Sequence, residues 1–227
     1  MTEGILNINK PTGMTSHDVV AHIRRKFNIK RVGHAGTLDP LATGVLVILV
    51  GRSATKLSDQ FMRFDKGYKA TLLLGTRTDT QDTDGTVVEQ RDSSKLTPDL
   101  VEEAMNKYLG AIDQLPPMYS AVKIKGKKLY EYARKGITIE RKTRRVNIHS
   151  INLNNFKLPE CVLDVQCSKG TYIRQLADDI GEDLKCGACI SALQRTKVGP
   201  FTLDNSVELE EVDEKDIRDW SNYQARF

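Results

Sequence analysis

The longest apolar run in the sequence is VLVILV, residues 45–50. Six residues are far fewer than the roughly 20 apolar residues that a membrane-spanning helix needs. A short run of Val, Leu and Ile is instead typical of a strand that is buried inside a sheet. The run therefore predicts a soluble, folded chain with a buried strand at this position.

Alternating and amphipathic patterns predict further elements along the whole chain. Strands place every second side chain on one face, and helices place apolar side chains three or four residues apart. The expected helices are 17–27 with Thr15 or Ser16 as cap, 53–62, 97–110, 127–135 and 172–184, and the expected strands are 4–9, 45–50, 67–75, 87–90, 118–124, 146–153, 161–167 and 189–198. We expect an α/β (α+β) fold with a mixed, largely antiparallel central sheet, flanked by helices and loops.

Length, N-terminus and cysteines set the broad class. The 227 residues are enough for one to two domains. The N-terminal residues MTEGILNINK have no basic stretch followed by a long apolar one, so we expect no signal peptide and a cytoplasmic location. The four cysteines are Cys161, Cys167, Cys186 and Cys189. One C-x-x-C pair without a second close pair does not make a zinc site, so we expect buried, reduced thiols and no metal.

The basic residues are concentrated in one segment. Residues 123–145 hold ten Lys or Arg and two Glu, a local net charge of +8, and the rest of the chain then carries −4 of the overall +4. Residues 203–227 hold eight acids and three bases. A basic segment on an acidic chain is typical of polyanion binding, and nearby Tyr119, Tyr130 and Tyr132 favour RNA because aromatic rings stack on unpaired bases. A solvated helix face is the alternative.

A Gly-rich loop carries one isolated carboxylate. Residues 33–44 read GHAGTLDPLATG, and Asp39 precedes Pro40, which disfavours a helical conformation at Asp39. A rigidly presented Asp can serve as a nucleophile, a general acid or base, or a metal ligand. It can also simply cap a turn. The absence of a second carboxylate in the loop argues against a metal site.

The same loop, GHAGTLDPLATGVL, closely resembles the catalytic motif of bacterial tRNA pseudouridine 55 synthases, the TruB family. Further segments resemble other motifs of that family in the same order: ILNINKPTGMTSHDVV, YKATLLLGTRTDTQDTDG, LPPMYSAVKIKGKKLYEYARKG, CSKGTYIRQLADDIG and ALQRTKVGPFTL. The resemblance runs from about residue 4 to residue 205. It implies isomerisation of uridine to pseudouridine in the T loop of tRNA, by base flipping and without a cofactor, and it is compatible with a role in tRNA folding.

The resemblance also implies a domain arrangement. Residues 1–205 are expected to form the pseudouridine synthase catalytic domain, with an RNA-clamping insertion at about 114–145. Residues 206–227 are expected to form a short acidic tail, too short for the RNA-binding PUA domain that many family members carry. The expected partner is the T stem-loop of tRNA. We expect a monomer that needs no obligatory protein partner and no membrane.

Three residues are expected to be catalytic by family pattern. Asp39 would be the nucleophile, attacking C6 of uracil or C1′ of ribose, or assisting a glycal route. Arg174 would pair with Asp39 and keep it ionised. Tyr68 would stack on the target uracil and help to remove the C5 proton. Without the motif, a surface arginine and a core tyrosine would be the simpler interpretations.

Further residues are expected to bind the substrate. His34 would replace the flipped base in the T-loop stack, Tyr172 would lie near the arginine, and Leu193 would support the extruded base. Phosphate contacts are expected from exposed cations: Lys10, Lys56, Lys123, Lys125, Lys127, Lys128 and Arg144. A backbone-bonded loop histidine, a core leucine and ordinary surface lysines are the alternatives.

Two rival functions remain open from the sequence. An RNA-binding or RNA-folding module would fit the charge and the aromatic residues equally well, and replacement of Asp39 by Asn separates it from an enzyme. A metal-dependent phosphodiesterase could use Asp39 with Asp79, Asp82 and Asp84. The loop that carries Asp79, Asp82 and Asp84 lacks the Glu that closes a calcium-binding loop. A reaction that is insensitive to EDTA would exclude this rival.

Overall fold

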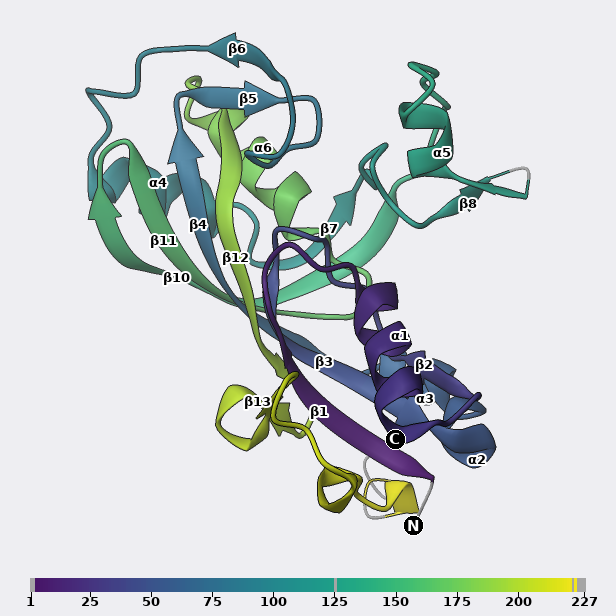
Figure 1. Cartoon of the computed structure of the whole chain (residues 1–227). Helices are drawn as coiled ribbons and strands as arrows, with labels where there is room; N and C mark the ends of the chain where they lie inside the picture. The colour runs from purple at the N-terminus through teal and green to yellow at the C-terminus, as the bar shows by residue number, and fades with distance from the viewer. Residues whose placement is uncertain (1–2, 125, 222, 224–227) are drawn as a thin grey trace. The chain divides into compact units, whose positions relative to one another are not determined.

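The computed structural model describes residues 3–124, 126–221 and 223, and the chain divides into two compact units. The first unit comprises Met1–Lys69 and Leu193–Phe227, and the second comprises Ala70–Ala192. Strands β4 (Lys66–Leu74) and β12 (Ala188–Val198) have residues in both units (Figure 1). Among the described residues, no helix has the length and apolar character to cross a membrane.

The first unit is built on strands in the order β14-β1-β3-β12, with β2 beside β3 and β13 beside β12. Its elements are β1 (Gly4–Lys10), α1 (Ser16–Phe27), β2 (Val32–His34), β3 (Thr43–Val50), α2 (Gly51–Thr55), α3 (Ser58–Met62), β13 (Phe201–Thr202), η1 (Leu203–Asn205), β14 (Val207–Glu208) and η2 (Glu214–Asp216). Strands β1 and β3 are antiparallel, from Gly4 opposite Val50 to Lys10 opposite Gly44. Strand β12 runs parallel to β3 and places Arg195 opposite Gly44.

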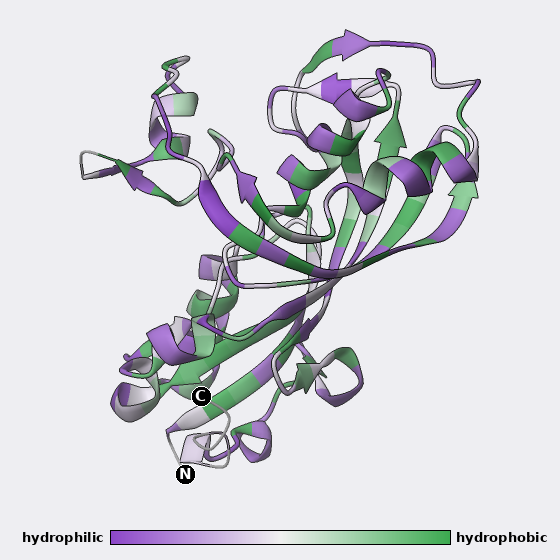
Figure 2. Ribbon diagram, turned by 180° about the vertical axis from the view of Figure 1, so that it is seen from behind, coloured by the Kyte–Doolittle hydropathy of each residue, from purple (hydrophilic) through white to green (hydrophobic). Residues whose placement is uncertain are grey.

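The predicted apolar strand is the centre of this unit. Every residue of β3 from Gly44 to Val50 is buried. Val45, Val47 and Leu49 contribute to a core cluster that is completed by Ile5, Ala35, Ala54, Phe61, Val198 and Phe201. Figure 2 shows the hydrophobic colour along most of the long central strand of this unit. Burial of a Val or Leu side chain contributes about 1.5–3 kcal/mol, so this strand supplies much of the unit's stability.

Helix α1 begins as its sequence predicts. Thr15 is the N-cap, and its side chain and that of Asp18 each accept a hydrogen bond from the other residue's backbone N–H, which is a capping box. Val19, Val20 and Ile23 form the buried face. The helix ends at Asn28, whose φ of 53° is left-handed.

The acidic C-terminal segment packs on the first unit. Leu209 and Val212 are 2% and 1% exposed, so apolar residues between the acids anchor the segment. Ile5 and Arg218 exchange two backbone hydrogen bonds of 2.8 and 2.9 Å, and Lys26 Nζ donates to the Glu210 carbonyl at 2.9 Å. The sequence predicts only a short acidic tail here, because its acidic composition conceals these few anchoring residues.

The second unit is a largely antiparallel sheet with the order β12-β4-β11-β10-β7. Its other elements are the β5–β6 hairpin (Thr76–Thr78, Val87–Gln90), α4 (Pro98–Asn106), β7 (Gly110–Gln114), the β8–β9 hairpin (Lys123–Ile124, Lys127–Lys128), α5 (Leu129–Ala133), β10 (Arg144–Lys157), β11 (Glu160–Cys167) and α6 (Ile173–Asp183). The expected fold class, a mixed α/β chain with a largely antiparallel sheet and flanking helices, is confirmed.

Short elements depart from the sequence-based expectation. The expected helix 53–62 is two five-residue helices, and the expected strand 118–124 is paired only at Lys123–Ile124. Strand β7 was not predicted, because its five residues follow a helix without a long apolar pattern. Elements of two to five residues are stabilised by contacts far away in the sequence rather than by their own pattern.

All four cysteines are buried, free thiols, as expected. Burial raises the pKa of Cys161 to about 12 and that of Cys189 to about 11. Both thiols are therefore protonated at neutral pH. Protonated, buried thiols are poor nucleophiles and poor metal ligands, which agrees with a structural role.

Candidate functional site

Asp39 lies at the tip of a hairpin loop in the first unit. Strands β2 and β3 pair antiparallel from Val32 opposite Val50 to His34 opposite Ile48, and the Ala35 N–H donates to the Val47 carbonyl at 2.9 Å. The loop that follows returns directly into β3. Its two ends are therefore fixed in the sheet, and the partly exposed Asp39 is presented at the turn.

The backbone of this loop is bound at six consecutive positions. Each peptide carbonyl from residue 36 to residue 41 accepts at least one hydrogen bond. The donors are Arg195 Nη2 to Gly36 O (3.2 Å), Arg195 Nη1 to Thr37 O (3.2 Å), Ser16 Oγ to Leu38 O (3.1 Å), Ala42 N to Asp39 O (3.1 Å), Gly13 N and Lys10 Nζ to Pro40 O (2.9 and 3.4 Å), and Thr12 Oγ1 to Leu41 O (3.2 Å). The path of the chain through Asp39 is thus specified by the folded first unit.

Lys10 does not occupy the surface position expected of a phosphate contact. Its side chain is fully buried, and Nζ also donates to the carbonyls of Pro11 (2.8 Å) and Met14 (2.6 Å). Burial lowers the pKa of Lys10 to about 8; the charge of Asp39 opposes this change and that of Arg195 adds to it. Lys10 therefore binds backbone, because three carbonyls surround the ammonium group that RNA would otherwise contact.

The remaining expected residues of the first unit differ in exposure. His34 is partly buried and its ring meets that of His17 edge to face, with centroids 5.4 Å apart. Tyr68 on β4 is 9% exposed and Leu193 on β12 is 7% exposed. Lys56, at the end of α2, is exposed.

Arg174 is a buried residue of the second unit rather than a surface arginine. It lies in the first turn of α6 and is 6% exposed. Its Nη1 donates to Thr80 O at 2.6 Å and its Nη2 to Tyr119 O at 2.9 Å, and its Nε lies 3.6 Å from Oδ2 of the equally buried Asp82. These contacts hold the guanidinium in one orientation.

The polar loop after β5 is fastened to strand β12. Ile190 donates its N–H to Gln81 O at 3.0 Å and accepts from the Thr83 N–H at 2.9 Å. Gln81 Nε2 binds Asp178 Oδ2 at 3.1 Å, and Asp178 Oδ1 accepts from Arg77 Nε at 2.9 Å. Of the acids of TDTQDTDG, Asp79 accepts from the Thr86 N–H at 2.8 Å and Asp82 pairs with Arg174. The described residues include no group of three or more His, Cys, Asp or Glu suited to a metal ion.

Tyr172 is placed by a buried glutamine. Its N–H donates to Gln114 Oε1 at 2.8 Å, and Gln114 Nε2 donates to its carbonyl at 3.1 Å. Gln114 is 2% exposed and ends β7. The unpredicted strand β7 therefore fixes the N-cap residue of α6.

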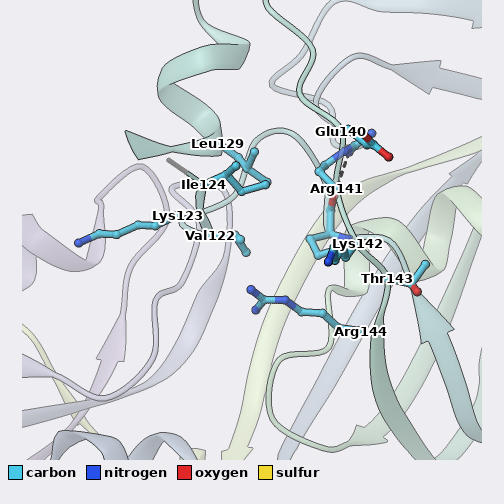
Figure 3. Close-up of a pocket in the computed structure, with 10 residues that line it drawn as sticks. Val122, Lys123, Ile124, Leu129, Glu140, Arg141, Lys142, Thr143 and Arg144 are labelled. Atoms are coloured by element: carbon cyan, nitrogen blue, oxygen red, sulfur yellow. Dashed lines mark hydrogen bonds between the residues drawn. The ribbon is translucent and has the colours of Figure 1, made fainter. Parts of the chain in front are cut away.

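The basic segment 123–145 belongs to the second unit and surrounds a cavity of about 420 Å³. Its lining comprises Pro116, Val122, Lys123, Ile124, Leu129, Glu140, Arg141, Lys142, Thr143 and Arg144. In Figure 3 the Arg144 side chain extends toward the side of the cavity that Val122 lines. Arg141 Nη1 donates to Pro116 O at 2.9 Å. Lys123, Lys127, Lys128 and Arg144 lie in this segment as expected, and Lys125 lies outside the described residues.

Tyr130 already has cationic neighbours within its own segment. Lys128 Nζ lies 5.4 Å and the Arg134 guanidinium 5.2 Å from the centre of its ring. Cations at this distance from an aromatic face are attracted to it.

Sequence reasoning missed Arg195 and Ser16. Arg195 lies two residues after Leu193 on β12, and in a strand residues two apart face the same side. A charged residue on the buried face of a strand is the indication that could have identified it. Ser16 was considered only as a cap, whereas its hydroxyl accepts from Leu38 N at 2.8 Å.

Comparison with known proteins identifies the class to which this fold belongs. A solved chain from a Cbf5–Nop10–Gar1 complex aligns with a TM-score of 0.73 at 30% identity, over 92% of this chain and 53% of that chain. A chain of an H/ACA ribonucleoprotein bound to a substrate RNA with 2′-deoxyuridine gives 0.69 and 27%, over 92% and 51%. This chain thus spans about half the length of each. The model of the TruB family pseudouridylate synthase N-terminal domain matches residues 24–173, which defines the class as pseudouridylate synthases.

The relatives specify the family within that class. The model of the tRNA pseudouridylate synthase B C-terminal domain matches residues 174–223. The tRNA pseudouridine synthase B of Alkaliphilus oremlandii is 52% identical over 92% of this chain and 69% of its own length, and that of Clostridium tetani is 48% identical over 96% and 75%. The chain belongs to the TruB family of pseudouridylate synthases.

Proposed function

We propose that this chain isomerises uridine to pseudouridine at position 55, in the T loop of tRNA, with the carboxylate of Asp39 as the catalytic group. Its curated relatives carry the name tRNA pseudouridine synthase B. The observation that supports Asp39 is the loop of six bonded carbonyls, which presents one partly exposed carboxylate. A fixed orientation of the attacking group is worth a large part of a reaction barrier.

The reaction needs no added atom and no change of oxidation state. The bond between ribose C1′ and uracil N1 breaks, a bond between C1′ and C5 forms, and the C5 proton is lost while N1 gains one. The carboxylate can add to C6, add to C1′ or assist a glycal, and all three routes conserve atoms and electrons. No cofactor enters any of them.

The other site residues keep the roles that the family resemblance implies. Arg174 serves the active site as a held guanidinium, Tyr68 stacks on the uracil, and Tyr172 lies close to the reacting base. Leu193 supports the extruded base and His34 fills its place in the RNA stack. The burial of Arg174 and its bonds to Thr80 and Tyr119 support a fixed functional side chain.

Substrate binding requires base flipping and a basic clamp. Extrusion of a base costs a few kcal/mol, which contacts to the rest of the RNA must supply. We assign these contacts to residues 114–145 and to exposed lysines such as Lys56, with residues 1–205 as the catalytic domain and 206–227 as its C-terminal extension. The chain acts in the cytoplasm as a monomer and needs no protein partner.

The test is tritium release from tRNA that is labelled at C5 of uracil. Wild-type protein is expected to release tritium, and Asp39→Asn to release none above background, because an amide cannot act as the nucleophile. Asp59→Asn, at an exposed aspartate of α3, is the matched control and should keep the wild-type rate. Tritium release by Asp39→Asn would refute the assignment of Asp39, and an inactive wild type would refute the reaction.

A further inference from the structure

Arg195 is a buried cation whose hydrogen bonds all go to peptide carbonyls. It lies on β12, is 1% exposed, and donates from Nε to Val45 O at 2.8 Å and from its two Nη atoms to Gly36 and Thr37. Among the described residues it makes no ion pair with a carboxylate. The guanidinium thus ties the Asp39 loop to the strand that follows it.

A buried charge in this position is an unusual way to stabilise a fold. Removing a charged group from water costs several kcal/mol, and replacing a buried charged group by an apolar side chain of similar volume is often neutral or stabilising. The other large side chains buried to the same degree are apolar, apart from Lys10. Lys10 and Arg195 both bind the Asp39 loop, which indicates that these buried cations serve to hold this loop.

We propose that Arg195 is a positioning residue for the reaction, which holds the backbone of Gly36 and Thr37 so that Asp39 is presented in a single orientation. This inference rests on the proposed function of Asp39. Lys10 responds to the charges of both Asp39 and Arg195, so the three charged groups form one electrostatic cluster.

The geometry requires arginine rather than lysine. Three nitrogens of one planar group reach three carbonyls on two chain segments, whereas a lysine ammonium is a single point of charge. The close approach of β12 also depends on Gly44, where a Cβ would lie 2.2 Å from the carbonyl oxygen of Arg195. The register of β12 against β3 therefore determines where the guanidinium can reach.

The experiment compares Arg195→Met and Arg195→Lys with Lys197→Met, an exposed lysine two residues further along the same strand. Kinetics on tRNA and deuterium uptake by peptides that cover residues 35–43 are measured for each variant. Arg195→Met is expected to lower kcat about 10- to 100-fold, with KM changed less than about 3-fold, because misplacement of a reacting group reduces the chemical step. Arg195→Lys should be intermediate, and Lys197→Met should keep the wild-type kcat.

Deuterium uptake distinguishes this inference from the proposed function. Faster exchange in residues 35–43 together with a lower kcat, and with unchanged exchange in α6, supports the inference, whereas failure of the proposed function is recognised separately by tritium release from Asp39→Asn. A folded Arg195→Met protein with wild-type kcat, or with unchanged exchange in the loop, overturns the inference. If Arg195→Met does not fold, Arg195→Lys decides: wild-type kcat and exchange overturn the inference, and lower kcat with faster exchange supports it.

Discussion

Lys10 shows how burial converts a charged side chain into part of the scaffold. A lysine in water keeps its proton up to a pKa near 10.5, and burial among the carbonyls around the Asp39 loop lowers this value to about 8. Below pH 8 the folded protein therefore keeps a desolvated ammonium group at a cost in stability. Three carbonyl acceptors and the charge of Asp39 offset part of that cost.

The pH dependence of stability follows from this shift. Between pH 8 and 10.5 the unfolded chain holds the Lys10 proton and the folded chain does not, so Lys10 makes the free energy of unfolding rise with pH. The free energies of unfolding of the wild type and of Lys10→Met are measured with urea from pH 7 to pH 10. Over this range the value for the wild type should rise relative to that of Lys10→Met by roughly 1–3 kcal/mol. A difference that is independent of pH would contradict the lowered pKa.

The sequence drew attention to the proposed nucleophile more readily than to the residues that hold its loop. Asp39 was selected because glycines and a proline surround it within one loop and because the loop resembles a family motif. Lys10 was expected at the surface and Arg195 was overlooked, because Lys and Arg are seldom fully buried. Their burial depends on backbone carbonyls up to 159 positions away, which no local pattern reveals.

At the scale of elements, the long periodic segments were predicted well. Helices α1 and α6 and strands β3 and β12 lie within two residues of their expected bounds, because each carries its own pattern of apolar residues. Strand β6 was predicted with its observed bounds, whereas β5, β9 and β7 were not predicted, because these strands of two to five residues carry no long apolar pattern of their own. The parallel pairing of β3 with β12 is also non-local, and it depends on the absence of a side chain at Gly44.

Gly44 is expected to be essential for that pair. Its φ is +99° and an added Cβ would meet the Arg195 backbone at 2.2 Å, so Gly44→Ala should lower the free energy of unfolding by roughly 3–5 kcal/mol or prevent folding. Gly13 is the matched control, with φ +80° and no atom within 4 Å of an added Cβ. Gly13→Ala should cost only the backbone strain, about 1–2 kcal/mol. Equal losses in urea unfolding would contradict the steric argument.

At the scale of the whole molecule, charge is divided between two segments of the chain. Residues 123–145 carry a net charge of +8 and include a short hairpin, the helix α5 and most of a cavity lining, whereas residues 203–227 carry −5, and Val207, Glu208 and Glu210 of this segment contact β1 and α1. The acidic segment lies far from the basic segment in sequence, and it contributes to the low net charge of +4 for the whole chain. Affinity for RNA should therefore follow the local charge and not the net charge.

The salt dependence of tRNA binding tests this expectation. Each phosphate contact that is lost lowers the slope of log Kd against log salt by about 0.7–0.9. Lys142→Gln with Arg144→Gln, at two exposed residues that line the cavity, should therefore reduce the slope by up to about 1.8 and leave kcat at saturating tRNA unchanged. Lys95→Gln with Lys157→Gln removes the same charge from exposed positions elsewhere in the second unit and should leave the slope unchanged. Equal reductions of the slope by the two double substitutions would show that binding depends on net charge alone.

The bonded carbonyls of the Asp39 loop also bear on how such a loop can evolve. A peptide carbonyl is common to all twenty amino acids, so these bonds determine the path of the chain without dictating its side chains. Exposed loop positions such as Thr37 can vary at little cost. The constraint is transferred to Lys10, Thr12, Ser16 and Arg195, each of which lies outside the loop. Divergent copies of this loop should therefore keep their shape for as long as those four side-chain donors persist.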